Sequence, residues 1–476
     1  MRLRGSAATA AVVLCTVAAT AVPARAVALV ATVNPPVQCP APRVTGANPW
    51  PKPSPTPLPV VAPVIPDLPV PTATHAANFL TAYTRALRFN LISWFPTCYG
   101  GQTGPVNPGG TNEQAIRTPA MVASAVALAL ASKGYNPTAV GMSRYVAAQR
   151  VRHIAVGLAM NHKVNAGLTG WGRSVQSAYW AFHAGWGAWL VWPSLTAADR
   201  QCVARMVAYE ADWRRYQPVR YYRDRNGVIL TPGDTGAEEN AWNATVLYLA
   251  AAMLPTDPRA AGWRHQAIQL MAASFAKPSD LTNTTIVDGK PIKDWLAGSN
   301  INEDGTLVNH NIINPDYMST IRLNMYSLLV ARYANQAGPQ SALWNNAVVY
   351  SALINKSFRS PPYLAPGGTI YKRGTGNIYY PQGNDWGTVR PSMYAALDAL
   401  VATTRVCDAC NPRYWEAYHL LRLLQMQVRF TDGRTYAGRY TDPNSEDVSV
   451  MREQVVVSDL GGAWANEYLK QPPAPT

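Results

Sequence analysis

The chain has 476 residues, with 41 Lys and Arg against 27 Asp and Glu, and a formal net charge of +14. This basic excess favours an anionic partner. Since the chain has no dense block of lysines and arginines, we expect an acidic polysaccharide rather than nucleic acid. The alternative is that the charge serves only solubility or reflects a compositional bias toward arginine.

The first 26 residues have the pattern of a secretory signal peptide. Arg2 and Arg4 precede an apolar stretch over residues 7–22, and Ala24-Arg25-Ala26 matches a cleavage site. Cleavage near Ala26 removes three arginines and no acids, which lowers the net charge from +14 to +11. We therefore expect a secreted, extracellular protein.

Neither a lipid anchor nor membrane insertion is expected. Leu14 stands before Cys15, where a lipoprotein signal has a small residue. No later apolar run is long enough and free enough of charge to predict a membrane-spanning helix.

Five cysteines remain after cleavage, and export permits disulfides between them. A Cys39–Cys98 bond would fasten the N-terminal extension to the domain, and a Cys407–Cys410 bond would close a small loop. Cys202 would then be a buried free thiol. A single C-x-x-C pair is weak support for zinc, so we expect no metal and no cofactor.

Residues 27–73 form a proline-rich extension. Proline fixes φ and lacks an amide donor, which predicts an extended segment outside the core. Two roles remain open for it: a spacer that associates the enzyme with the cell envelope, or a segment that lies along the domain.

Residues 74–470 are expected to form one all-α catalytic domain. Apolar residues recur at i, i+3 and i+4 in twelve segments. These predicted helices are Ala76–Ser93, Thr118–Gly134, Ser143–His162, Gln176–Trp192, Thr196–Tyr216, Ala237–Leu254, Arg259–Ala276, Pro315–Ala337, Gln340–Phe358, Thr388–Thr403, Arg413–Val428 and Arg452–Leu469.

Consecutive helices without a fixed sequence repeat favour an α/α toroid, either incomplete or with six helical hairpins. The long loops 217–236, 278–314 and 360–387 are expected to rim one face, because long structured loops are usually functional. Short β-hairpins are predicted at residues 221–230, 369–372 and 435–439.

The first polar motif is Gly233–Asn243. Thr235 or Asp234 is expected to cap a helix whose first turn contains Glu238 and Glu239. The motif also places two amides and an aromatic side chain at the helix start, which is typical of a sugar or carboxylate contact. These residues are Asn240, Trp242 and Asn243, and Glu239 is a further candidate for binding substrate.

The second motif is residues 309–317. Asn314 and Pro315 are expected to start a helix. Asn309, His310, Asn311 and Tyr317 are left without a structural role, so we interpret His310 and Tyr317 as an acid–base pair.

The third motif, residues 378–387, alternates turn residues with aromatics. Tyr380 and Trp386 are candidates to stack on sugar rings, and Asp385 is a candidate to bind hydroxyls or transfer protons. The structural alternative is that Asp385 caps the helix predicted from Thr388.

A fourth group is aromatic. Trp171 and Trp186 lie beside glycines, which allow a ligand to approach the backbone closely. Of the two, Trp171 is the candidate residue for binding substrate. The other tryptophans between residues 180 and 192 are expected to be core.

In their order, these motifs resemble those of the α/α-toroid polysaccharide lyases of the hyaluronate/chondroitin type and the heparinase II/III-like type. The residues that carry the likeness are Thr235-Gly236-Ala237 followed by Asn240, and Asp304-Gly305-Thr306-Leu307-Val308-Asn309-His310 followed by Tyr317. The likeness covers about residues 230–390. The chain departs from the family in placing Glu238-Glu239 before the Asn, in lacking an Arg after it, and in having no room for the usual β-sandwich.

The resemblance implies a monomeric lyase that cleaves an acidic glycan by β-elimination. Asn240, or Asn243, would neutralise the uronate carboxylate, and His310 and Tyr317 would transfer protons. Arg322 or Arg373 would bind the acidic sugar, since guanidinium pairs bidentately with carboxylate.

Two alternatives use the same residues differently. A glycoside hydrolase needs two carboxylates, which would be Glu238 or Glu239 with Asp385, or with Asp304 or Asp316 in its place. A non-catalytic glycan-binding toroid would use the aromatics without turnover.

Overall fold

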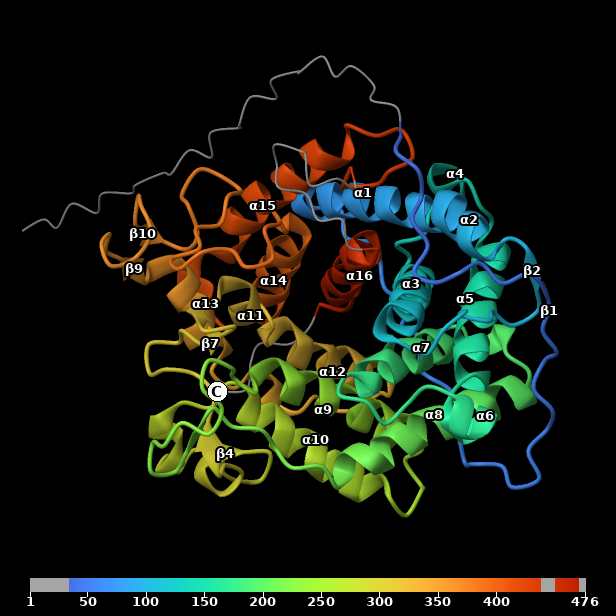
Figure 1. Ribbon diagram of the computed structural model, residues 1–476, viewed down its shortest axis with the longest axis horizontal. Helices are drawn as coiled ribbons and strands as arrows, with labels where there is room; N and C mark the ends of the chain where they lie inside the picture. The colour runs from blue at the N-terminus through green and yellow to red at the C-terminus, as the bar shows by residue number, and fades with distance from the viewer. Residues whose placement is uncertain (1–33, 438–449, 471–476) are drawn as a thin grey trace, which may run out of the picture.

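A computed structural model describes residues 34–437 and 450–470 of the chain (Figure 1). The signal peptide expected over residues 1–26, and the start of the extension, lie outside the described residues. The helices are α1 Thr74–Arg88, α2 Phe95–Tyr99, α3 Glu113–Ala131, α4 Pro137–Val140, α5 Arg144–Met160, α6 Lys163–Ala166, α7 Ser177–Leu190, α8 Ala197–Arg215, α9 Ala237–Met253, α10 Ala260–Ser274, α11 Pro315–Met318, α12 Ile321–Tyr333, α13 Asn346–Asn355, α14 Pro391–Thr404, α15 Pro412–Gln427 and α16 Arg452–Leu469.

The strands of the described residues are all two residues long, and each pairs with one other strand. The pairs are β1 Gly46–Ala47 with β2 Gln102–Thr103, β3 Arg223–Asp224 with β6 Gly298–Ser299, β4 Ile286–Val287 with β5 Lys290–Pro291, β7 Val308–Asn309 with β8 Ile312–Ile313, and β9 Ser357–Phe358 with β10 Gly368–Thr369. Only β1 and β2 are parallel. The expectation of a mostly helical protein with short strands in its loops is therefore confirmed.

Each of the twelve segments predicted to be helical contains a helix, with two informative differences. Helix α3 begins at Glu113, before the predicted Thr118-Pro119, because the Asn112 side chain accepts from the Ala115 amide at 3.0 Å. The segment predicted from Pro315 is two helices, α11 and α12. Residues 435–437 form no strand, and the rest of that predicted hairpin lies outside the described residues.

Helices α3, α7, α9, α12, α14 and α16 form a central group of six by their contacts, and Figure 1 shows them toward the middle of the molecule. Along this order each helix contacts the next, and α16 contacts α3. The remaining long helices pack outside them, with α5 against α3, α8 against α7, α10 against α9, α15 against α14 and α1 against α16. Large aromatic side chains fill the space between the six, including Tyr83, Trp186, Tyr326 and Trp464, all fully buried.

Helix α3 is long and apolar enough to cross a membrane by length and composition, contrary to the expectation from sequence. Its mean hydropathy is 1.3 over an 18-residue window that is 83% buried. It packs between α7 and α16, so its apolar character is explained by its place in the protein core.

The proline-rich segment 34–73, which we call the strap, lies along the domain. It runs across the C-terminal ends of five of the six central helices. The strap contacts are Val61 N to Met253 O at 2.9 Å, Val64 N to Tyr333 O at 2.7 Å, Trp189 Nε1 to Val61 O at 2.8 Å, Tyr468 Oη to Pro66 O at 2.9 Å and Lys133 Nζ to Leu68 O at 2.9 Å. Because terminal carbonyls of α9 and α12 have no partners within their helices, strap amides satisfy them.

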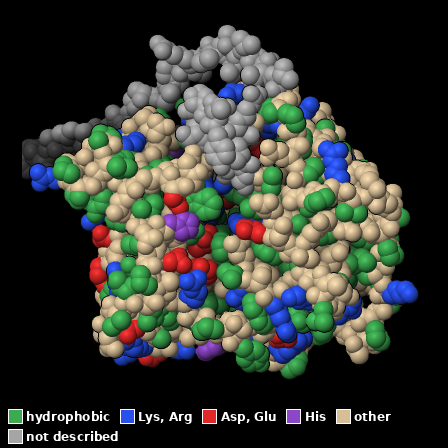
Figure 2. Space-filling view, viewed as in Figure 1, with side chains coloured by type: hydrophobic (Ala, Val, Ile, Leu, Met, Phe, Trp, Pro, Cys, Tyr) green, Lys and Arg blue, Asp and Glu red, His purple; other side chains and the backbone are tan. Residues whose placement is uncertain are grey.

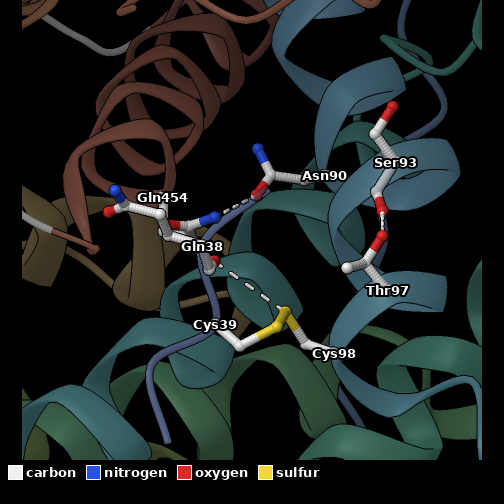
Figure 3. The surroundings of a disulfide bond; sticks show 7 residues. All are labelled: Gln38, Cys39, Asn90, Ser93, Thr97, Cys98 and Gln454. Carbon is white, nitrogen blue, oxygen red and sulfur yellow. Dashed lines mark hydrogen bonds between the residues drawn. A yellow bond between two sulfur atoms is a disulfide. The ribbon is translucent and has the colours of Figure 1, made fainter. Parts of the chain in front are cut away.

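A disulfide between Cys39 and Cys98 fastens the start of the strap, as predicted (Figure 3). Beside it, Gln454 of α16 donates to Asn90 at 2.9 Å. The second predicted disulfide, Cys407–Cys410, is also present, and Cys202 is a buried free thiol. Two disulfides are consistent with an oxidising compartment.

Candidate functional site

The first two polar motifs are joined by a β-hairpin. Strands β7 and β8 bring Asn309 against the loop before α9, where its amide nitrogen donates to Asp234 Oδ1 at 2.7 Å. The Thr235 amide donates to Val308 O at 3.0 Å, and the Asn311 amide donates to Gly233 O at 2.9 Å. The hairpin therefore holds the second motif at the start of α9, although about seventy residues of sequence separate them.

His310 occupies the tip of this hairpin. His310 and Asn311 have φ of 54° and 65°, so both central residues of the turn are in the left-handed region, as a type I′ turn requires. Asparagine and histidine are among the residues that tolerate this conformation. A side chain carried on a two-residue turn between paired strands has little freedom of position, which suits a group that must meet a substrate.

His310 links the second motif to the third. Its Nδ1 pairs with the Asp385 carboxylate, and its Nε2 lies 3.2 Å from the Tyr317 hydroxyl. The Trp386 ring lies 5.8 Å from the imidazole. Asp385 does not cap α14, which begins at Pro391. The geometry is a carboxylate–imidazole–phenol chain, in which the carboxylate orients the imidazole and the imidazole accepts from the phenol.

The Tyr317 phenol is held in its neutral form. Burial raises its pKa well above the ordinary value, and the carboxylates of Glu238 and Glu239, when ionised, raise it further. A raised pKa means that the phenol gives up its proton with difficulty and that a phenolate, once its proton has passed to His310, is a strong base.

Tyr317 lines a cavity of about 330 Å³ at the N-terminal ends of the central helices. Figure 2 shows a hollow on this face, around which acidic and basic side chains gather. Every one of the six central helices contributes to the cavity lining at or near its first turn. The lining residues are Glu113, Gln114 and Arg117 of α3, Gln176 before α7, Glu238 and Trp242 of α9, Asp316, Tyr317, Thr320 and Arg322 of α11 and α12, Trp386, Arg390 and Met393 at α14, and Met451, Arg452 and Val455 at α16.

Four arginines line the cavity and give it positive character: Arg117, which pairs with Glu113 at 2.7 Å, Arg322, Arg390 and Arg452. Arg117 lies over the rings of Tyr179 and Trp242, at 5.2 and 5.7 Å. Arg390 pairs with Asp316 at 3.1 Å and lies over the Trp386 ring at 4.8 Å. Arg322 is buried and pairs with Asp459 at 3.1 Å. The positive ends of the surrounding helix dipoles add to these charges, so the cavity attracts anions.

Glu238 is the acidic group inside this cavity whose pKa is most altered. Burial raises it to about 8, and the neighbouring Glu239 charge contributes, while Arg117, Arg322 and Arg390 act in the opposite direction. Within the described part of the chain no hydrogen bond or ion pair engages its carboxyl. It is therefore mostly protonated at neutral pH and can donate a proton or a hydrogen bond to a ligand.

Glu239 has a different environment from its neighbour. Its carboxylate pairs with Arg220, which also contacts Asp234 at 3.3 Å. This ion pair occupies Glu239, so it supports the loop before α9 and is not among the residues lining the cavity.

Five other candidate residues lie outside the cavity lining. Asn240 is buried, donating to Arg220 O at 2.8 Å and accepting from Arg220 N at 3.2 Å. Trp171 is buried, and its Nε1 donates to Leu158 O at 2.8 Å. Asn243 is 8% exposed, and its Oδ1 has no hydrogen-bond partner. Arg373 lies over the Tyr414 ring, and the Tyr380 hydroxyl donates to Asp316 at 2.9 Å. None of these three residues lines the cavity.

Trp186, beside glycines, is fully buried. A Cβ at Gly187 would lie 2.8 Å from the backbone of Ala123, so this glycine allows α7 to approach α3 closely. The Gly-Trp-Gly pattern at residues 185–187 thus has a packing explanation, not a ligand-binding one.

Arg117, Arg390 and Glu113 also line the cavity, although no sequence motif indicated them. Their common signal is position, since each lies at the first turn of a helix or just before it. The starts of α3 and α14 were both placed incorrectly from the sequence, and that error concealed the signal.

Comparison with protein-family models and with curated proteins finds no match for this chain. In residues 34–437 and 450–470, no group of three or more His, Cys, Asp or Glu side chains is arranged to hold a metal ion.

Proposed function

We propose that this protein is a secreted polysaccharide lyase with an α/α-toroid fold, which cleaves a uronic-acid glycan by β-elimination. The observation that carries the proposal is the Asp385–His310–Tyr317 chain at an arginine-lined cavity. The circular order of contacts among the six central helices supports the toroid, and the two disulfides support export.

In the proposed reaction, His310 takes the Tyr317 proton while Asp385 stabilises the imidazolium that forms. The Tyr317 phenolate then takes the C5 proton of the uronate. The electrons of the broken C5–H bond form the C4=C5 double bond as the C4–O bond breaks. The leaving oxygen receives a proton from Tyr317, and His310 returns a proton to the phenolate, so the enzyme ends as it began.

The uronate carboxylate must be neutralised for the C5 proton to become acidic. Because Asn240 is occupied by the Arg220 backbone, we assign this role to Arg117 and Arg390, with the protonated Glu238 as a hydrogen-bond donor. In this assignment, guanidinium groups neutralise the carboxylate, whereas the resemblance to the toroid lyases implies an asparagine amide in that role. Trp386, 45% exposed at the mouth, supplies a surface for stacking on a sugar ring.

A glycoside hydrolase is the second candidate, and Glu238 favours it. A carboxyl with a pKa of about 8 suits a general acid. Its partner would be Asp316 or Asp385. Asp316 accepts hydrogen bonds from two tyrosines and pairs with Arg390, whereas Asp304 pairs with Lys356 away from the cavity.

The test is a panel of uronic-acid polymers, with alginate, hyaluronan and polygalacturonate included, followed by both ultraviolet absorbance and reducing ends. Elimination raises the absorbance, because it creates a conjugated double bond, and hydrolysis produces reducing ends alone. Asp385→Asn should lower kcat about 100-fold. The exposed Asp294→Asn is the matched control and should leave kcat unchanged. Reducing ends without absorbance would favour the hydrolase instead.

A further inference from the structure

The described residues that line the cavity come from every helix of the central circle or from the residue before it. A groove that binds the middle of a polymer has two walls and two open ends. Here the lining residues come from α3, the residue before α7, α9, α11 and α12, the residues at α14, and α16, which is the complete circle of central helices. Among the described residues, no helix of this circle is without a lining residue, so a chain that enters the cavity meets protein in every direction at the level of the helix starts.

The floor of the cavity is also closed. Trp242 is stacked on Tyr179, with ring centroids 5.8 Å apart, and the fully buried Phe182, Trp186 and Tyr326 lie next in the same aromatic cluster. At the opposite end of these helices the strap crosses their C-termini. A polymer cannot thread through the centre of the protein.

The size of the cavity agrees with its closed shape. Its volume of about 330 Å³ lies at the lower end of the ~300–1,000 Å³ of small-molecule sites. Such a space admits a short terminal segment of a glycan and excludes a long internal stretch. Tyr317 and Trp386 line the same space, so the reacting bond would lie close to the enclosed end of the chain.

We infer that this cavity receives the terminus of an acidic glycan chain, so that the protein acts on chain ends. This inference rests on the proposed function for its substrate class. The anionic group of the terminal sugar would meet Arg117 and Arg390, and the remainder of the chain would leave through the mouth past Trp386.

Binding stoichiometry tests the inference independently of cleavage. Tyr317→Phe protein is titrated calorimetrically with short, medium and long size-fractionated chains of alginate, hyaluronan and polygalacturonate. End binding predicts the same number of protein molecules per chain at every length. A number that rises in proportion to chain length would overturn the inference, as would an absence of binding to all three polymers.

Wild-type protein is examined in parallel for absorbance and product size. End action predicts short unsaturated products from the first time points, with slow loss of viscosity; early products of intermediate length with rapid loss of viscosity would contradict it. Absorbance together with length-dependent stoichiometry would keep the lyase and reject end binding. Constant stoichiometry without absorbance or cleavage would keep end binding and reject the lyase.

Discussion

The hydroxyl of Tyr317 lies 3.2 Å from Nε2 of His310, and the other nitrogen of that imidazole pairs with Asp385. Tyr317 lies in the short helix α11, His310 lies at the tip of a hairpin, and Asp385 lies in the loop before α14. Under the proposed function this chain would move a proton between the phenol and the imidazole, and the predictions for catalysis follow from it.

Tyr317→Phe keeps the ring and removes only the hydroxyl. We expect kcat for the formation of unsaturated product to fall at least about 100-fold, because the proton carrier is lost. Tyr145→Phe is the control, since Tyr145 is 74% exposed on α5 and should have no effect. Retention of activity by Tyr317→Phe would exclude the phenol as base.

Glu238→Gln separates the two enzymatic candidates. If Glu238 only donates a hydrogen bond to the substrate, the amide replaces it and kcat should change less than about tenfold. If Glu238 is the acid of a hydrolase, the amide cannot supply a proton and kcat should fall about 100-fold or more. Initial rates from reducing ends and absorbance at neutral pH provide the comparison.

The raised carboxyl pKa values predict how stability depends on pH. The pKa of Glu238 is about 8, and burial raises those of Glu416 and Glu453 to about 7. Between about pH 6.5 and pH 8 the folded protein therefore binds more protons than the unfolded chain, whose Glu pKa is about 4.3. The free energy of unfolding should fall as pH rises through this window.

Urea unfolding at several pH values across the window measures this slope. Glu238→Gln should make the free energy of unfolding depend less on pH in the upper part of this pH window, because glutamine does not titrate. A free energy of unfolding that rises with pH in the wild-type protein would contradict the raised pKa values of these carboxyl groups.

Arg322 is expected to matter for stability as well as for the charge of the cavity. Arg322→Met leaves the buried Asp459 carboxylate without its partner, which should cost about 3–5 kcal/mol of the free energy of unfolding. The exposed Arg405–Asp408 pair is the control, and Arg405→Met should leave Tm almost unchanged. Equal Tm values for the two variants would show that burial does not decide the effect.

The two disulfides should differ in their effect on stability. Chain entropy predicts a loss of about 4 kcal/mol for C39S/C98S, whose cysteines are 59 residues apart, and about 2 kcal/mol for C407S/C410S, which are 3 apart. Denaturant unfolding of the two double variants measures the difference. A larger loss for C407S/C410S would contradict the proposed role of the first bond in fastening the strap.

The local pattern of residue types was sufficient to predict much of this helical architecture. The 3.6-residue spacing of apolar side chains predicted where the helices lie, because each helix buries one face whatever its neighbours are. The disulfides and the buried Cys202 were also predicted, and Asn314 caps α11 as expected, accepting from the Asp316 amide at 3.1 Å.

Short-range patterns were less informative about side-chain direction. Asn240 and Asn243 share a helical face in the sequence, yet Asn240 is bound to a backbone segment 20 residues earlier. The hairpin at His310 was missed because His310-Asn311 occupies the two turn positions, and Asn311 stands where a type I′ turn usually has glycine.

The sequence by itself determined that this is a mostly helical protein with a proline-rich extension, cysteines suited to two disulfides and three polar motifs before helices. Only the tertiary structure decided that Tyr317, Glu238 and Arg390 share one cavity, and that Asn240 does not face it. The physical reason is that the cavity lies where six helices begin, so its residues are neighbours through helix packing. Sequence spacing records the face of one helix, and it contains no record of which helices will stand next to one another.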